Sequence, residues 1–169
     1  MAERAMQAEM VRYFAAEKQE SLLFVAAGLA ALVAAALLLR GSGPYRAMAW
    51  PLAAVAAIQL AVGGTVLLRT DRQVAALEAR LAADPAGFRV EEAARMERVM
   101  GGFRLYKAVE IALLAAGIAL CLAFPRRQGW YAAGIGLLVQ AALMLVLDLF
   151  AEKRGRDYLD AIARLGGAP

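Results

Sequence analysis

Five amide or charged side chains lie inside the apolar stretches of this chain and are its candidates for chemistry. They are Gln59, Lys107, Glu110, Gln140 and Asp148. Amide and ionisable groups are costly in hydrocarbon, so those that persist there often bind ions, relay protons or contact a substrate. We therefore take these five as the intramembrane polar candidates of the protein.

Gln59 and Gln140 fall near the middle of the second and the fourth apolar stretch. An amide in hydrocarbon needs a hydrogen-bonding partner, and a bond between helices contributes about 1 kcal/mol. We expect the two amides to hold helices together, and each is a candidate partner for the other. The alternative is that they line a path for a substrate or an ion.

Glu110 and Asp148 lie closer to the ends of their stretches than to the middle. Lys107 precedes Glu110 by three residues, which is pairing distance on a helix. We expect ion pairs with Lys107, Arg69 or Lys153 to make the two carboxylates tolerable in place. Proton coupling is the alternative, although a carboxylate nearer mid-depth would suit it better.

Four apolar stretches carry these groups, and each is long enough to cross a bilayer, which takes roughly 20 residues in a helix. Hydrophobic residues make up 62% of the chain, and the charges gather between the stretches. The fold class predicted is all-α, an integral membrane four-helix bundle with one domain over residues 1–169. We expect an amphipathic helix over 1–21, spans over 22–39, 47–68, 105–124 and 129–151, a helical connector over 69–104 and a tail over 152–169.

The basic residues predict how the chain is oriented. All of its 19 lysines and arginines lie on one side of the four spans, apart from Arg40, Arg46, Arg126 and Arg127 in the two short loops. Cytoplasmic loops carry the excess of Lys and Arg. We therefore expect both termini and the connector in the cytoplasm, and we attribute the net charge of +4 to contact with anionic lipid rather than nucleic acid.

The two halves of the sequence resemble each other. At one constant offset, Phe14 and Lys18 match Phe103 and Lys107, and at a second offset Gln59 matches Gln140. Pro44, Arg46 and Asp71-Arg72 find counterparts in the second half, at Pro125, Arg127 and Glu152-Lys153. This pattern predicts two helical hairpins that are parallel repeats, related by a pseudo-two-fold axis along the membrane normal.

Apolar stripes mark the segments that precede the first and third spans. Their members are Met6, Met10 and Phe14 in the first segment and Met96, Met100 and Phe103 in the second. The spacing is typical of amphipathic cytoplasmic helices. These six residues are candidates for a face that binds lipid or a partner, and the alternative is that they cover the inner end of the bundle. Past the second span, we expect the helix to continue until Asp84-Pro85-Ala86-Gly87.

The residue types exclude most catalytic chemistry. The chain has no histidine and a single cysteine, Cys121, which lies in an apolar stretch. Sequence motifs for a nucleophile, a thiol pair or a phosphate loop are missing. We expect no catalytic residues, no metal site and no cofactor.

Two charged runs carry a resemblance. Arg95-Met96-Glu97-Arg98-Val99-Met100 is followed by Phe103, Tyr106-Lys107 and Glu110, and the second run is Leu147-Asp148-Leu149-Phe150-Ala151-Glu152-Lys153-Arg154-Gly155. They make the whole chain resemble a group of uncharacterised short bacterial four-span inner-membrane proteins. The resemblance implies a multi-pass location in the bacterial inner membrane, and it transfers no activity.

Three functions fit these patterns. The first is a non-enzymatic interaction protein, an accessory or immunity-type subunit that binds another membrane protein or a membrane-active toxin. The second is a small transporter or channel that uses the intramembrane glutamines and acidic residues. The third is a scaffold that binds lipid through its basic side. The partners expected are membrane lipids together with another membrane protein or a second copy of this chain.

Overall fold

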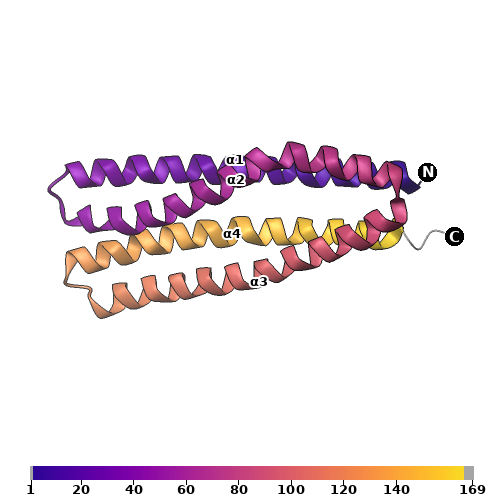
Figure 1. The fold of residues 1–169 in the computed structure, drawn as a ribbon. Helices are drawn as coiled ribbons and strands as arrows, with labels where there is room; N and C mark the ends of the chain where they lie inside the picture. The colour runs from indigo at the N-terminus through magenta and orange to yellow at the C-terminus, as the bar shows by residue number, and fades with distance from the viewer. Residues whose placement is uncertain (1, 166–169) are drawn as a thin grey trace.

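The computed structural model describes residues 2–165 as an all-α bundle of four long helices (Figure 1). They are α1 (Ala2–Arg40), α2 (Ala49–Ala83), α3 (Pro85–Ala123) and α4 (Gln128–Leu165), and a short 3-10 helix, η1 (Pro44–Met48), precedes α2. Each long helix is long and apolar enough to cross a membrane. The predicted all-α bundle with four candidate spans is confirmed. The spans predicted over 22–39 and 129–151 fall within α1 and α4, whereas the one over 47–68 begins in η1 and the one over 105–124 ends one residue past α3.

The helices form two antiparallel hairpins, α1 with α2 and α3 with α4 (Figure 1). The beginning of α1, the end of α4 and the α2–α3 junction lie at one end of the bundle, and both hairpin turns lie at the other. At about 1.5 Å per residue, a helix of this length spans about 57 Å, nearly twice the hydrocarbon thickness. We call residues 22–68 and 105–151 the membrane half, and residues 2–21, 69–104 and 152–165 the cap.

A single residue separates α2 from α3. The Asp84 side chain accepts a hydrogen bond from the backbone N–H of Gly87 at 2.9 Å, and Pro85 opens the helix, where its missing N–H costs nothing. This confirms the predicted stop at residues 84–87. The second span continues as a helix to Ala83, as predicted, and α4 likewise runs from the membrane half into the cap without a break.

The segments predicted as amphipathic helices are not separate elements. Residues 2–21 are the first half of α1, and the stripe from Met96 to Phe103 lies within α3, which runs through Gly101 and Gly102 without interruption. The tail predicted over 152–169 is helical as far as Leu165, and its last four positions lie outside the described residues.

The membrane half exposes its large apolar side chains. Leu37, Leu68 and Leu122, for example, are 60%, 83% and 76% exposed. Its contacts with other helices are made largely by small residues. Exposed tyrosines and tryptophans gather near the turns, at Tyr45, Trp50, Trp130 and Tyr131, as in the aromatic belts at a membrane–water interface. An apolar surface of this kind is favourable in contact with lipid and unfavourable in contact with water.

The cap contains the main core of large side chains, and all four long helices contribute to it. Its fully packed members are Met6, Met10, Tyr13, Phe14, Leu81, Phe88, Met96, Tyr158, Ala161 and Ile162. The cap therefore packs as a water-soluble four-helix bundle does, with its apolar residues turned inward.

Candidate functional site

Charged side chains from all four helices meet where the cap joins the membrane half. We call this level the junction. Its members are Glu17, Lys18 and Glu20 of α1, Arg69, Thr70 and Asp71 of α2, Lys107 and Glu110 of α3, and Asp148, Glu152, Arg154 and Arg156 of α4. The junction contains three of the five intramembrane polar candidates.

Each hairpin is closed at the junction by a lysine–carboxylate pair. In the first hairpin, Lys18 Nζ lies 2.8 Å from Asp71 Oδ2, with side chains 42% and 74% exposed. In the second, Lys107 bonds to Glu152, and the two side chains are only 24% and 7% exposed. The hydrogen bond from Lys107, helped by Arg156, holds the pKa of the Glu152 carboxyl below its usual range. The equivalent lysine–carboxylate pair is therefore exposed to solvent in the first hairpin and largely buried in the second.

Three further contacts within the junction involve carboxylates of α1. Arg154 of α4 bonds to Glu20 of α1 and so ties the two hairpins together. Within the first hairpin, Glu17 accepts a hydrogen bond from Thr70 Oγ1 at 3.5 Å and lies 4.0 Å from Arg69. Burial raises the pKa of the Glu17 carboxyl despite these partners.

Glu110 and Asp148 are not paired as we expected. Lys107 bonds to Glu152, Lys153 bonds to Asp157 at 2.9 Å, and Arg69 lies beside Glu17. Within residues 2–165, neither carboxylate has a basic side chain at ion-pair distance. The sequence rule fails here because Lys107 reaches across to α4 instead of bonding along its own helix. The two acidic groups instead contact each other.

Gln59 and Gln140 do meet. Gln140 Nε2 donates to Gln59 Oε1 and to the Leu52 carbonyl, both at 3.5 Å, and the two side chains are buried. Gln59 Nε2 has no acceptor among the described residues. The contact joins α2 to α4 and thus the first hairpin to the second, which is the role we expected for an interhelical amide bond.

Glycines set the close approaches within the membrane half. A Cβ built on Gly117 would lie 3.0 Å from the Gly134 carbonyl oxygen, and one on Gly134 would lie 2.9 Å from the Gly117 carbonyl oxygen. Gly28 and Gly63 do the same in the first hairpin, against α2 and α1 respectively. Backbones can approach this closely only where side chains are absent. These glycines allow α1 to pack closely on α2, and α3 on α4. The close packing of each pair positions the junction residues next to one another.

An aromatic and ionic network fills the centre of the cap. Tyr13 stacks on Tyr158 with ring centroids 4.5 Å apart, and Tyr158 donates its hydroxyl to Glu92 at 3.1 Å. Arg95 binds both oxygens of Glu92 at 2.7 Å and lies over the ring of Phe14. Burial raises the pKa of Tyr13 to about 12 and raises that of Tyr158 further. This network was not predicted, because its contacts between helices join residues that lie far apart in the chain, such as Tyr13 with Tyr158 and Tyr158 with Glu92.

Four of the six residues proposed as a lipid or partner face are buried inside the bundle. Met6, Met10, Phe14 and Met96 are at most 3% exposed within the chain itself. Met100 and Phe103 are half-buried and lie against Gly155 of α4. In this arrangement they cover the inner end of the bundle, which was the alternative interpretation, and they present no continuous face to a partner.

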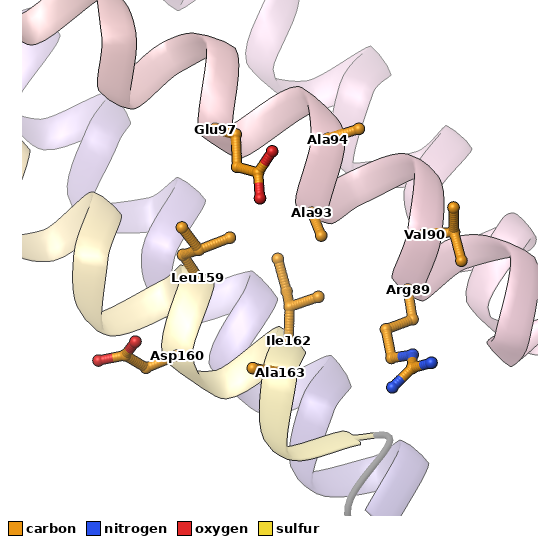
Figure 2. Close-up of a pocket in the computed structure, with 9 residues that line it drawn as sticks. All are labelled: Arg89, Val90, Ala93, Ala94, Glu97, Leu159, Asp160, Ile162 and Ala163. Atoms are coloured by element: carbon orange, nitrogen blue, oxygen red, sulfur yellow. The ribbon is translucent and has the colours of Figure 1, made fainter.

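A shallow groove of about 450 Å³ runs between α3 and α4 in the cap (Figure 2). Ala93, Leu159 and Ile162 face one another across it, whereas Asp160 points away (Figure 2). The charged residues along it are Arg89, Glu97 and Asp160. They do not converge on one point (Figure 2).

The described residues contain no group of three or more His, Cys, Asp or Glu side chains that could hold a metal ion. What the junction offers is a set of buried charges and one carboxyl–carboxyl contact. No family model, curated protein or solved structure matches this chain. The resemblance to short bacterial four-span proteins therefore stays a prediction.

Proposed function

We propose that the protein is a non-enzymatic integral membrane interaction protein, an accessory or immunity-type subunit that binds another membrane protein or a membrane-active toxin. The observation that supports this most is how little of α3 is buried in the membrane half. In its most apolar window, 11% of residues are buried, against 22–28% in the other three helices. α3 packs mainly against α4 and leaves its other faces to the lipid.

The lipid-facing side of α3 has the composition of a helix-packing surface. Ala108, Ala112, Ala115, Ala116 and Ala119 are all exposed and share one face of the helix. Pairs of small residues four apart let two transmembrane helices approach closely and pack tightly. The face lies roughly opposite Glu110 and Gly117, which turn toward α4. A transmembrane helix of a partner could pack there without displacing any contact within this chain.

Proximity crosslinking in native membranes tests the proposal. The double variant Ala112→Leu/Ala116→Leu thickens the α3 face, and Ala26→Leu/Ala30→Leu is its matched control, because these alanines are exposed in α1 at the same spacing. We expect a defined crosslinked partner that is lost with the α3 variant and kept with the α1 variant. Equal recovery with both variants contradicts the proposal.

A small transporter or channel is the second candidate, and the Glu110–Asp148 contact favours it. Buried ionisable groups within spans often mark ion or proton pathways. Reconstituted into proteoliposomes, a transporter would show flux that disappears with Glu110→Gln or Asp148→Asn. Flux in the wild type would favour this candidate over the interaction protein.

We also propose a bacterial inner-membrane location with both termini in the cytoplasm. Support comes from the basic residues, which gather at the cap end of the bundle, where α1 begins and α4 ends. Membrane lipids are then partners of the whole apolar surface. A reporter active only in the periplasm should stay inactive when it is fused after Pro169.

Two geometric matches support the proposed parallel repeats. The residues matched in sequence as Lys18 with Lys107, and Asp71 with Glu152, form equivalent ion pairs in their hairpins. The matched glutamines, Gln59 and Gln140, face each other. Equivalent residues meet in this way when they lie next to a two-fold axis. Disulfide formation between cysteines placed at positions 59 and 140 would test the contact.

A further inference from the structure

The carboxyl groups of Glu110 and Asp148 join α3 to α4 at the junction, within hydrogen-bonding reach of each other. Glu110 is 1% exposed, and neither of its carboxylate oxygens has a hydrogen-bond donor among residues 2–165. A buried carboxylate without a donor or a counter-ion is strongly destabilising, and two carboxylates in contact repel each other. Full ionisation of the pair is thus the least favourable state of this contact.

The charged groups around the pair do not neutralise it. Glu20 of α1 and Glu152 of α4 act on Asp148 with the same sign of charge. The cations at this level are engaged elsewhere: Lys107 with Glu152, Arg154 with Glu20, and Arg69 of α2 with Glu17. The neighbouring charges therefore disfavour a second negative charge on the Glu110–Asp148 pair.

We propose that Glu110 and Asp148 form a proton-binding site, in which one shared proton fastens α3 to α4. One carboxyl group carries the proton and donates its O–H to the other, so the pair holds a single negative charge. The proton comes from water on the cap side, and no covalent or redox step is involved. Two carboxyl groups in contact suffice to hold a proton, whereas the described residues offer no cluster with enough ligands for a metal ion.

The bound proton makes the junction sensitive to pH. While the proton is held, the contact between the helices is attractive. When the proton leaves at higher pH, two like charges stay in contact in a buried place, and α3 loosens from α4. This inference stands apart from the proposed partner, because proton binding is a property of the purified chain.

Infrared spectroscopy of the detergent-solubilised protein tests the proposal directly. We expect the wild type to keep the carbonyl band of a protonated carboxyl group at neutral pH and to lose it as the pH rises. Glu110→Gln and Asp148→Asn should each lack that band, because the introduced amide donates to an ionised partner. Asp71→Asn is the matched control, since Asp71 is an exposed, lysine-paired carboxylate of the first hairpin, and its band should equal that of the wild type.

Thermal stability gives a second, independent readout. Between pH 6 and pH 9 we expect the melting temperature of the wild type to fall by roughly 5 °C more than that of Glu110→Gln. Asp148→Asn serves in its place if Glu110→Gln does not fold. The proposal is overturned if the wild type lacks the protonated band at neutral pH or if Glu110→Gln retains it. It is also overturned if Na⁺ or K⁺ at fixed pH shifts the melting temperature of the wild type and not of Glu110→Gln, which would indicate a cation site.

Discussion

The cap and the membrane half are built from the same four helices, yet their large apolar side chains point in opposite directions. In the cap, aromatic, methionine and leucine side chains point inward and are almost fully buried. In the membrane half, leucines, valines and isoleucines point outward, and glycines and alanines make many of the helix contacts. The change occurs within single uninterrupted helices, at the level of the junction.

The difference follows from the solvent on each side. In water, burying a large apolar side chain contributes about 1.5–3 kcal/mol, so the cap gains by turning such residues inward. In lipid that gain vanishes, and close backbone contact and hydrogen bonds hold helices together instead. Substitutions of one kind should therefore have unequal effects in the two regions.

The largest effect is expected in the core of the cap. Phe14→Ala removes a side chain that is 1% exposed and should lower the free energy of unfolding by about 3–5 kcal/mol. Leu37→Ala, on the lipid-facing side of α1, is the control and should leave it nearly unchanged. Denaturant titration in mixed micelles measures both. Equal losses would mean that both halves bury apolar surface alike.

Next in size is the buried ion pair of the second hairpin. Lys107→Met leaves Glu152 buried with Arg156 alone and should cost about 2–3 kcal/mol. Lys18→Met breaks the exposed pair of the first hairpin and should cost less than about 1 kcal/mol.

The same pair predicts a pH dependence. Because the pKa of Glu152 is lowered in the folded state, the pair stabilises the fold at neutral pH, and this contribution disappears as the pH falls through the folded-state pKa. Melting temperatures measured down to about pH 3 should therefore fall less steeply for Lys107→Met than for the wild type. Identical slopes would contradict the coupling.

Glycine contacts should give an intermediate effect in the membrane half. Gly117→Ala places a methyl group 3.0 Å from a backbone oxygen of Gly134, which cannot move aside cheaply, and should cost about 1–3 kcal/mol. Gly64→Ala meets nothing within 4 Å and should be neutral or slightly stabilising. If the two variants melt alike in detergent, close packing at Gly117 does not hold the second hairpin.

The smallest effect is expected at the glutamines. Gln140→Leu removes two long hydrogen bonds and should cost about 0.6 kcal/mol, the average found for interhelical bonds in lipid. Gln59→Leu should resemble it. A loss above about 2 kcal/mol, or a gain of ion leak in proteoliposomes, would assign these amides more than a structural role.

The fold could be predicted from the sequence because its signals are local. Long apolar runs predict spans, and Asp84-Pro85 ends one helix and starts the next. The distribution of basic residues predicts that both ends of the chain lie on the same side of the spans. The partners of charged residues could not be predicted in this way. Lys107 lies three residues from Glu110 and yet bonds to Glu152 on another helix, because the contact between α3 and α4 brings that carboxylate closer.

The apolar stripe shows the same limit. Periodicity identifies Met10 and Phe14 as one face of a helix, but it does not say what covers that face. Here the covering surface is made by residues of three other helices, among them Phe88 and Ile162. The cap network of Tyr13, Glu92 and Tyr158 was missed for the same reason, since each residue alone is typical of a helix surface.

Thiol accessibility in intact cells tests the central claim, that four spans separate the cap from the two turns. In a variant lacking Cys121, single cysteines replace the exposed residues Gly43 and Arg127 in the turns, or Arg72 and Asp157 in the cap. A membrane-impermeant maleimide added to the outside of the cells should label the turn positions, and the cap positions only after the membrane is permeabilised. Labelling of both sets without permeabilisation, or of the cap set alone, would contradict the account.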